Sequence, residues 1–297
     1  MKKFRFKKID AFATPKSGGN PAGYIRLNAS TDISPAEMQQ IARELKGFVN
    51  EVGYVIQTSD NGFDLKFYSS EREVDFCGHA TIAIMYDLAG NDAELQKFEL
   101  FKINTNRGEL MVENRITGED SMFIMSPEPV EVHVVPGIQE VADKLKINSG
   151  SINADLPISI INAGLTTLIV PIKTLNAILG ISPDFNALND FCLKSGIDIV
   201  EVFSRDVADR SNQYRTRVFA TTFGYMEDPA TGSGNSAFGY YLIKNNMWKD
   251  GTITIEQNGL KDRFNLVRLM KKPDKNGNIR VYFGGGAVTR IVGEYWL

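Results

Sequence analysis

The sequence predicts an α+β protein made of two similar lobes, on three observations. The chain has 297 residues, which is more than a single hydrophobic core usually serves. Each half contains strand-like segments on either side of one markedly apolar helix. Landmarks of the first half also recur in the second half in the same order. We therefore expect two lobes, each with a mixed, mostly antiparallel sheet around a central helix.

In the first half, residues 4–12 alternate as a strand does, and a glycine-rich turn at 18–23 precedes a second strand at 24–27. Ser34-Pro35-Ala36-Glu37 is a capping box with proline at the first helical position, so a helix is expected from there to Gly47. The turn at 77–80 begins the apolar helix, which continues to Leu88. Further strands are expected at 52–56, 63–68, 98–104 and 109–113.

The second half begins after Ser126-Pro127-Glu128-Pro129, which is typical of a linker. This places the lobes at 1–126 and 127–287. Ser182-Pro183-Asp184 caps a helix that ends at Gly196, and a glycine turn at 231–234 leads into the second apolar helix. Strands are expected at 199–203, 214–220 and 252–256.

The two halves resemble a duplicated domain. Three landmark pairs are separated by 148, 151 and 154 residues, as expected if the loops lengthen gradually. They are Ser34 with Ser182, Phe67 with Val218, and Cys77 with Thr231. A cleft between two such lobes would be the natural place for a ligand.

Composition limits the possible partners. There are 33 basic and 36 acidic residues, a net charge of -3, and no large basic cluster, so no nucleic-acid partner is expected. Cys77 and Cys192 lie far apart and no secretory prefix is visible, which indicates reduced thiols and a cytoplasmic location. No stretch is apolar for long enough to suggest a membrane partner.

The motifs resemble those of the phenazine-biosynthesis PhzF-like proteins, which share the diaminopimelate epimerase fold. The most specific phrases are residues 76–81, Phe-Cys-Gly-His-Ala-Thr, and residues 227–235, Glu-Asp-Pro-Ala-Thr-Gly-Ser-Gly-Asn. Shorter matches lie at 10–12, 19–23, 50–51 and 284–288. The resemblance implies an active site between the lobes, a possible homodimer, and a final segment, about 288–297, that completes the first lobe.

The two apolar helices both begin at glycines, and their exposed amides and positive dipole ends suit a small carboxylate substrate. Glycine also allows a ligand to approach the backbone closely. The expected substrate-binding residues are Asn20, Gly78, Ala80, Gly232 and Gly234.

Four residues are expected to carry the chemistry. Glu51 lies within the apolar run 48–56, where burial would make its carboxylate a stronger general base. The resemblance implies that this glutamate moves a proton on carbon, while His79, Asp228 and Ser233 orient the substrate or relay protons. Without the family pattern, Glu51 could equally reach solvent at a strand edge, and Asp228 and Ser233 could be ordinary turn and cap residues. Cys77 could be packed or, at a helix start, reactive.

The expected activity is therefore a cofactor-independent isomerase, with no metal or redox cofactor. The two histidines and two separated cysteines cannot form a standard zinc site made of histidine and cysteine ligands. A two-thiol racemase is not expected either, because Thr231 stands where its second cysteine would be. One alternative is a dinucleotide-binding oxidoreductase, because residues 232–237 fit Gly-x-Gly-x-x-Ala and Glu256 follows at a suitable distance for a ribose contact. Another is a non-catalytic protein that binds a small acid.

Overall fold

The computed structural model describes all 297 residues, Met1–Leu297, and they divide into two compact units. Unit 1 comprises Met1–Met125 and Gly284–Leu297, and unit 2 comprises Ser126–Phe283. The chain thus leaves unit 1, builds the whole of unit 2 and returns to unit 1. None of its helices has both the length and the apolar character that crossing a membrane requires.

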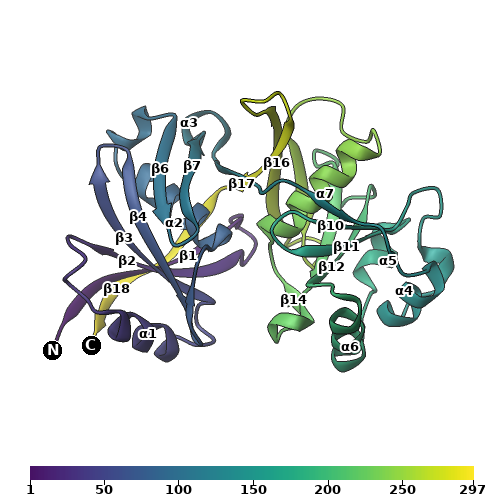
Figure 1. The fold of residues 1–297 in the computed structure, drawn as a ribbon, viewed down its shortest axis with the longest axis horizontal. Helices are drawn as coiled ribbons and strands as arrows, with labels where there is room; N and C mark the ends of the chain where they lie inside the picture. Colours follow the sequence, from purple (N-terminus) through teal and green to yellow (C-terminus); the bar gives the residue numbers. More distant parts are fainter. The chain divides into compact units, whose positions relative to one another are not determined.

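Unit 1 contains nine strands and three α-helices. Figure 1 labels most of them. In chain order they are β1 (Lys3–Ala11), β2 (Asn20–Leu27), α1 (Pro35–Glu44), β3 (Glu51–Ser59), β4 (Gly62–Ser69), β5 (Glu73–Val74), α2 (Gly78–Gly90), β6 (Leu100–Thr105), β7 (Gly108–Asn114), α3 (Ile116–Glu119), β8 (Met122–Met125) and β18 (Ala287–Trp296). A short 3-10 helix, η1 (Leu95–Lys97), follows α2.

The sheet of unit 1 is mixed. β1 pairs antiparallel with both β2 and β18, β2 pairs parallel with β3, and β4 pairs antiparallel with β3 and parallel with β6. α2 packs against β1, β2, β3, β8 and β18, so the strands surround it. Nine of its residues are buried, because a helix enclosed on every side needs apolar side chains all round rather than along one stripe.

Unit 2 repeats this plan with different lengths. Its elements are β9 (Val130–Val132), α4 (Ile138–Leu145), η2 (Ser149–Ser151), β10 (Ser159–Asn162), β11 (Thr166–Pro171), α5 (Leu175–Leu179), α6 (Phe185–Ser195), β12 (Ile199–Ser204), β13 (Tyr214–Phe219), η3 (Thr221–Phe223), β14 (Glu227–Asp228), α7 (Gly232–Lys244), β15 (Ile253–Gln257), β16 (Asn265–Pro273) and β17 (Ile279–Gly285), whose last two residues belong to unit 1.

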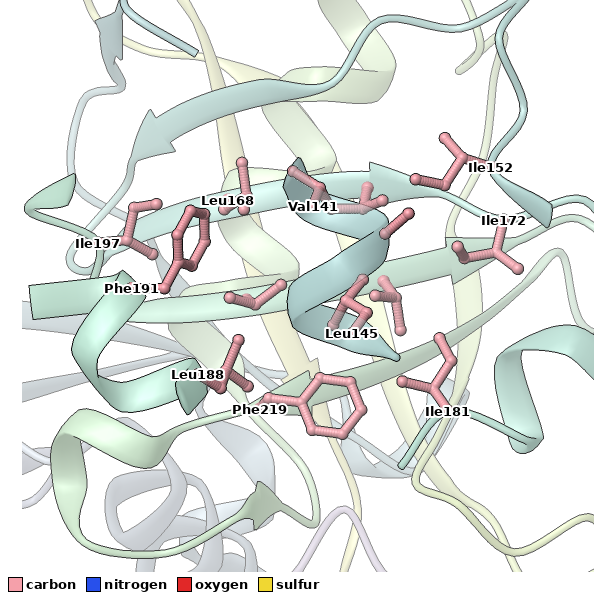
Figure 2. Close-up of a cluster of buried hydrophobic side chains, with 14 of the residues drawn as sticks. Val141, Leu145, Ile152, Leu168, Ile172, Ile181, Leu188, Phe191, Ile197 and Phe219 are labelled. Atoms are coloured by element: carbon pink, nitrogen blue, oxygen red, sulfur yellow. The ribbon is translucent and has the colours of Figure 1, made fainter. Parts of the chain in front are cut away.

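The sheet of unit 2 has apolar packing on both faces. α7 packs against β10, β11, β12 and β16 and is buried along most of its length. The opposite side is covered by α4, α5 and α6, whose apolar side chains meet those of the strands in one cluster (Figure 2). In that cluster Val141 and Leu145 of α4 and Phe191 of α6 lie with Leu168 and Phe219 of the sheet. Strands buried on both faces account for the uninterrupted apolar runs in this half.

Strand register shows that the two units match in the strands and turn that lead into the enclosed helix. Phe67 lies opposite Val74 in unit 1, and Val218 lies opposite Asp228 in unit 2; in both units the enclosed helix begins four residues later. Cys77 and Thr231 are the N-caps of those helices. Two of the three expected landmark pairs are thus confirmed.

The third landmark pair is wrong by two residues. Ser34 caps α1 through its hydroxyl, as the capping box predicts. The matching cap of α6 is Asp184 rather than Ser182, because its carboxylate accepts a hydrogen bond from the amide of Ala187 and the helix begins at Phe185. Aspartate and serine cap about equally well, so the serine-proline pattern alone did not fix the start.

Candidate active site

Glu51 is the first residue of β3, beside the ends of two neighbouring strands. It lies opposite Ala22 of β2 and Ser69 of β4. The preceding residue, Asn50, donates a hydrogen bond from Nδ2 to Oδ1 of buried Asn20, at 3.0 Å. The side chain of Glu51 is 21% exposed. The expected binding residue Asn20 therefore supports the strand end from which the expected base projects.

His79 and Cys77 approach Glu51 from the start of α2. Nε2 of His79 lies 3.2 Å from Oε2 of Glu51, and Nδ1 of His79 lies 3.4 Å from Sγ of Cys77. Oε2 of Glu51 is buried and has no hydrogen-bond partner, so its approach to His79 is an ionic contact rather than an aligned hydrogen bond. This leaves a carboxylate oxygen able to accept a proton.

The three side chains influence one another electrostatically. Burial lowers the pKa of His79, but Cys77 and Glu51 raise it by more, so the pKa of His79 lies well above its usual value. Burial, reinforced by the Glu51 carboxylate, raises the pKa of Cys77. The raised pKa of Cys77 favours its protonated thiol, and the Glu51 carboxylate favours the protonated form of His79. A reactive Cys77 thiolate, which its position at a helix start allowed, is not supported.

A metal ion needs several ligand atoms close together, and Glu51, Cys77 and His79 provide three. Their potential ligand atoms all lie within 4.8 Å of one another. Counting only histidine and cysteine ligands overlooked this set, because its third member is a carboxylate. Thiolate, imidazole and carboxylate are all ligands of Zn²⁺, although the thiol would first have to lose its proton.

The starts of α2 and α7 have the features expected of anion sites within their own units. Neither Cys77 nor Thr231 forms a side-chain capping hydrogen bond, and neither helix has an acidic residue in its first turn. Gly78 and half-buried His79 begin α2, with Ala80 fully buried behind them. No capping side chain or first-turn carboxylate therefore offsets the partial positive charge at the start of either helix.

In unit 2, Asp228 and Ser233 lie on either side of the α7 start and both are half-buried. Oδ1 of Asp228 accepts from the amide of Ala230 at 3.2 Å, as in an ordinary Asx turn. Ser233 belongs to the first turn of the helix. Their positions fit both the expected catalytic roles and the simpler turn and cap roles.

Gln257 was missed by sequence reasoning. Its Oε1 accepts hydrogen bonds from the amide of Thr231 at 3.0 Å and from Nδ2 of Asn235 at 2.6 Å. Its Nε2 donates to the carbonyl of Asp228 and the hydroxyl of Thr231. Gln257 thus holds the turn that carries the family motif, but it lies at the end of β15, and no local pattern links it to that turn.

The glycines of α7 are required by packing inside unit 2. A Cβ on Gly232 would lie 2.4 Å from the ring of Phe283, and one on Gly234 would lie 2.7 Å from Oε2 of Glu201. Packing alone therefore accounts for these glycines, because the protein fills their side-chain directions, and their role in substrate binding stays a prediction. Their amides remain candidates for binding.

Glu201, the second residue that sequence reasoning missed, is a buried acid under α7. It is fully buried on β12, and neither carboxyl oxygen has a hydrogen-bond partner. Burial, with a smaller contribution from Asp228, raises the pKa of Glu201 well above its usual value. A single acidic residue in an apolar strand gives no sign of this environment.

Register shows that the two units carry different chemistry at equivalent positions. Glu51 corresponds to Ile199, because each lies two residues before the position that pairs with Phe67 or Val218. His79 likewise corresponds to Ser233, as the second residue of its helix. The glutamate-histidine pair therefore exists only in unit 1, which is evidence against two equivalent bases.

Comparison with protein families identifies the chain. Residues 9–293 match the family described as phenazine biosynthesis-like protein, PhzC-PhzF. The chain belongs to this family. The expected recognition of a PhzF-like protein is confirmed across nearly the whole sequence.

Relatives and solved structures agree with this PhzC-PhzF assignment. The chain is 28% identical to an uncharacterised isomerase of Clostridium acetobutylicum, over 99% of this chain and 98% of the relative. It is 26% identical to the trans-2,3-dihydro-3-hydroxyanthranilate isomerase of Pseudomonas fluorescens, over 80% and 78%. A Bacillus anthracis PhzF-family structure matches with a TM-score of 0.87 at 24% identity, covering both chains completely. The expected α+β fold and the expected enzyme class, an isomerase, are confirmed; the homodimer and the cytoplasmic location stay predictions.

Glu256, the acidic residue that the dinucleotide-binding alternative needs for a ribose contact, is already engaged within the protein. Glu256 is fully buried and pairs with Arg215 at 3.1 Å. It also accepts hydrogen bonds from the amides of Ala208 and Asp209 and from Nδ2 of Asn212. A carboxylate used in this way cannot also hold a ribose hydroxyl.

Proposed function

We propose that this protein is a PhzF-type isomerase that moves a proton between carbon atoms of a small carboxylate, with Glu51 as the base. The observation that carries the proposal is the Glu51-His79 pair, in which Oε2 of Glu51 is buried, has no hydrogen-bond partner and lies 3.2 Å from Nε2 of His79. An oxygen without a hydrogen-bond partner is free to accept a proton from a substrate carbon held beside it. The isomerase names of the relatives support the reaction class.

In the proposed reaction, the Glu51 carboxylate removes a proton from a carbon next to a double bond or carbonyl group of the substrate. The electron pair shifts along the unsaturated system, and the proton returns at another carbon. Nothing is oxidised or reduced, and Glu51 is regenerated. The imidazolium of His79 stabilises the Glu51 carboxylate before transfer and can donate or relay a proton after it.

The other expected site residues have binding roles in this proposal. Amides at the starts of α2 and α7, around Gly78, Ala80, Gly232 and Gly234, would hold the substrate carboxylate. Asp228 and Ser233 of unit 2 would orient the substrate or relay a proton. The Pseudomonas fluorescens relative acts on a dihydro-hydroxyanthranilate, so we propose an unsaturated carboxylate of similar size for this protein.

The test is deuterium exchange. The protein is incubated in heavy water with a panel of unsaturated and amino acids, and NMR is used to detect deuterium at carbon. The expected result is exchange into one class of substrate, lowered about 10²- to 10⁴-fold by Glu51→Gln. Glu99→Gln, which changes an exposed glutamate of the same unit, is the matched control and should keep full activity. Full activity in Glu51→Gln would refute this mechanism.

Two further measurements separate the alternatives. Thermal stabilisation by one of these acids without any exchange would favour a non-catalytic binding protein. Saturable micromolar binding of NADH would favour the oxidoreductase. Under our proposal, Asp228→Asn and Ser233→Ala each slow exchange while the protein stays folded, whereas pure turn and cap roles would change stability alone.

A further inference from the structure

A second candidate site lies in unit 1 at the other end of α2. A cavity of about 310 Å³ is formed between β1, β2 and the C-terminal end of that helix. Arg5, Lys7, Tyr24 and Arg26 line its strand side, and Asp87 and Asp92 are among the residues on the helix side. His79 is near the N-terminus of α2, and the eight residues from His79 to Asp87 correspond to about 12 Å of helix between the two places.

Three of the four side chains on the strand side of this cavity are positively charged. Phe6 pairs with Ile25 and Lys7 with Tyr24, so the same antiparallel register puts Arg5 directly opposite Arg26. Side chains alternate between the faces of a strand, and Arg5 and Lys7 therefore share one face with Tyr24 and Arg26. Like charges directly opposite each other in a sheet are destabilising. The two exposed guanidinium groups therefore repel each other across β1 and β2, and on its other side Arg5 lies opposite Glu294 of β18, which pairs with Lys3.

Neither carboxylate of the cavity forms an ion pair with these two arginines. Asp87 is buried and is already bound by Lys7, by the Tyr24 hydroxyl at 2.7 Å and by the Thr289 hydroxyl at 2.7 Å. Oδ1 of Asp92 accepts from the amides of the chain two and three residues later.

The arginines themselves have no acidic partner. Arg26 donates to the neutral side chain of Gln57, and Arg5 forms no ion pair. The C-terminal end of α2 contributes only about half a negative charge. With Lys7, the lining carries three positive charges against two carboxylates and this helix end, so it keeps a small net positive charge.

We propose that this cavity binds the phosphate group of a small molecule. Two guanidinium groups on adjacent strands offer paired N–H donors, an arrangement that matches the oxygens of a phosphate. A phosphate dianion would balance both arginines and relieve their repulsion. Tyr24 and Leu88 give the cavity an apolar side for the remainder of the ligand. This site is independent of the proposed isomerase reaction.

The test uses inorganic phosphate as the probe. Binding is followed by ³¹P NMR and calorimetry at constant ionic strength, with chloride as the replaced anion. We expect saturable binding to the wild-type protein, and a Kd at least about tenfold weaker for the double variant Arg5→Gln/Arg26→Gln, since each charge-assisted hydrogen bond lost costs about a factor of ten or more. Arg43→Gln, an exposed arginine at the end of α1, is the control and should bind like the wild type.

The stability of the double variant gives an independent check. Removing two like charges should raise its Tm above that of the wild type when phosphate is absent, so a loss of binding cannot be attributed to unfolding. Equal phosphate affinity in the wild type and the double variant would overturn the proposal, because the binding would then lie elsewhere, for example at the amides that begin α2 or α7. Absence of saturable binding by the wild type would overturn it as well.

Discussion

Replacing Glu201 by glutamine should stabilise the protein increasingly as the pH rises. Glu201 is fully buried, has no hydrogen-bond partner, and has a pKa raised well above its usual value by burial and by Asp228. In the unfolded chain a glutamate loses its proton near pH 4.3. Between that pH and the higher pKa of the folded state, folding takes up one proton, so the free energy of unfolding falls as pH rises.

The size of this effect follows from linkage. One proton taken up on folding changes the free energy of unfolding by about 1.4 kcal/mol per pH unit. While Glu201 stays protonated in the folded state, its burial therefore removes about 2.7 kcal/mol of stability between pH 5 and pH 7. Glutamine has nearly the same shape and no proton to lose, so Glu201→Gln should recover this amount.

Urea unfolding at pH 5, 6 and 7 measures the difference between the two proteins. Glu140→Gln, at an exposed position of α4 in the same unit, is the matched control, and its difference from wild type should not change across this range. A ¹³C NMR titration of the Glu201 carboxyl gives a direct second readout. A pH-independent difference for Glu201→Gln would refute the reasoning, because the folded protein would then hold this carboxylate in its charged form.

Two further substitutions test the packing around the enclosed helix and the buried ion pair. A Cβ on Gly53 would lie 2.4 Å from Cδ1 of Ile84, so Gly53→Ala should cost about 1–3 kcal/mol in urea unfolding, whereas Gly118→Ala, with open space around it, should cost much less. Arg215→Met should cost about 3 kcal/mol because it leaves the fully buried Glu256 without its cation. Adding Glu256→Gln to that variant should recover part of the loss, and strictly additive losses would show that the two side chains are not coupled.

Local chemistry made much of unit 1 predictable. The Ser34-Glu37 capping box fixed the start of α1, and the apolar run after Cys77 identified an enclosed helix, because both signals lie within a few residues of each other. The Glu51-His79 contact could be expected only through the family motif. Nothing in the spacing of 51 and 79 shows that a strand end and a helix start meet.

Unit 2 shows what local chemistry cannot provide. The burial of Glu201 and the hydrogen bonds of Gln257 depend on strand pairings that bring distant segments under one helix turn. The glycines of that turn predict a close approach to the backbone, and Phe283 and Glu201 are the protein groups that lie there. A glycine indicates that something lies close to the backbone, but the sequence does not say whether it is a ligand or the protein.

The return of the chain to unit 1 has a consequence for synthesis on the ribosome. β18 pairs along the whole length of β1, yet it is translated only after all of unit 2. At about 5–20 residues per second, the intervening segment takes roughly 10–30 s to make. During that time β1 has one of its two edges uncovered, while unit 2 can already fold. A nascent chain stalled before residue 287 would therefore expose a sheet edge, and we expect the folding of unit 1 to be completed last, by its final strand.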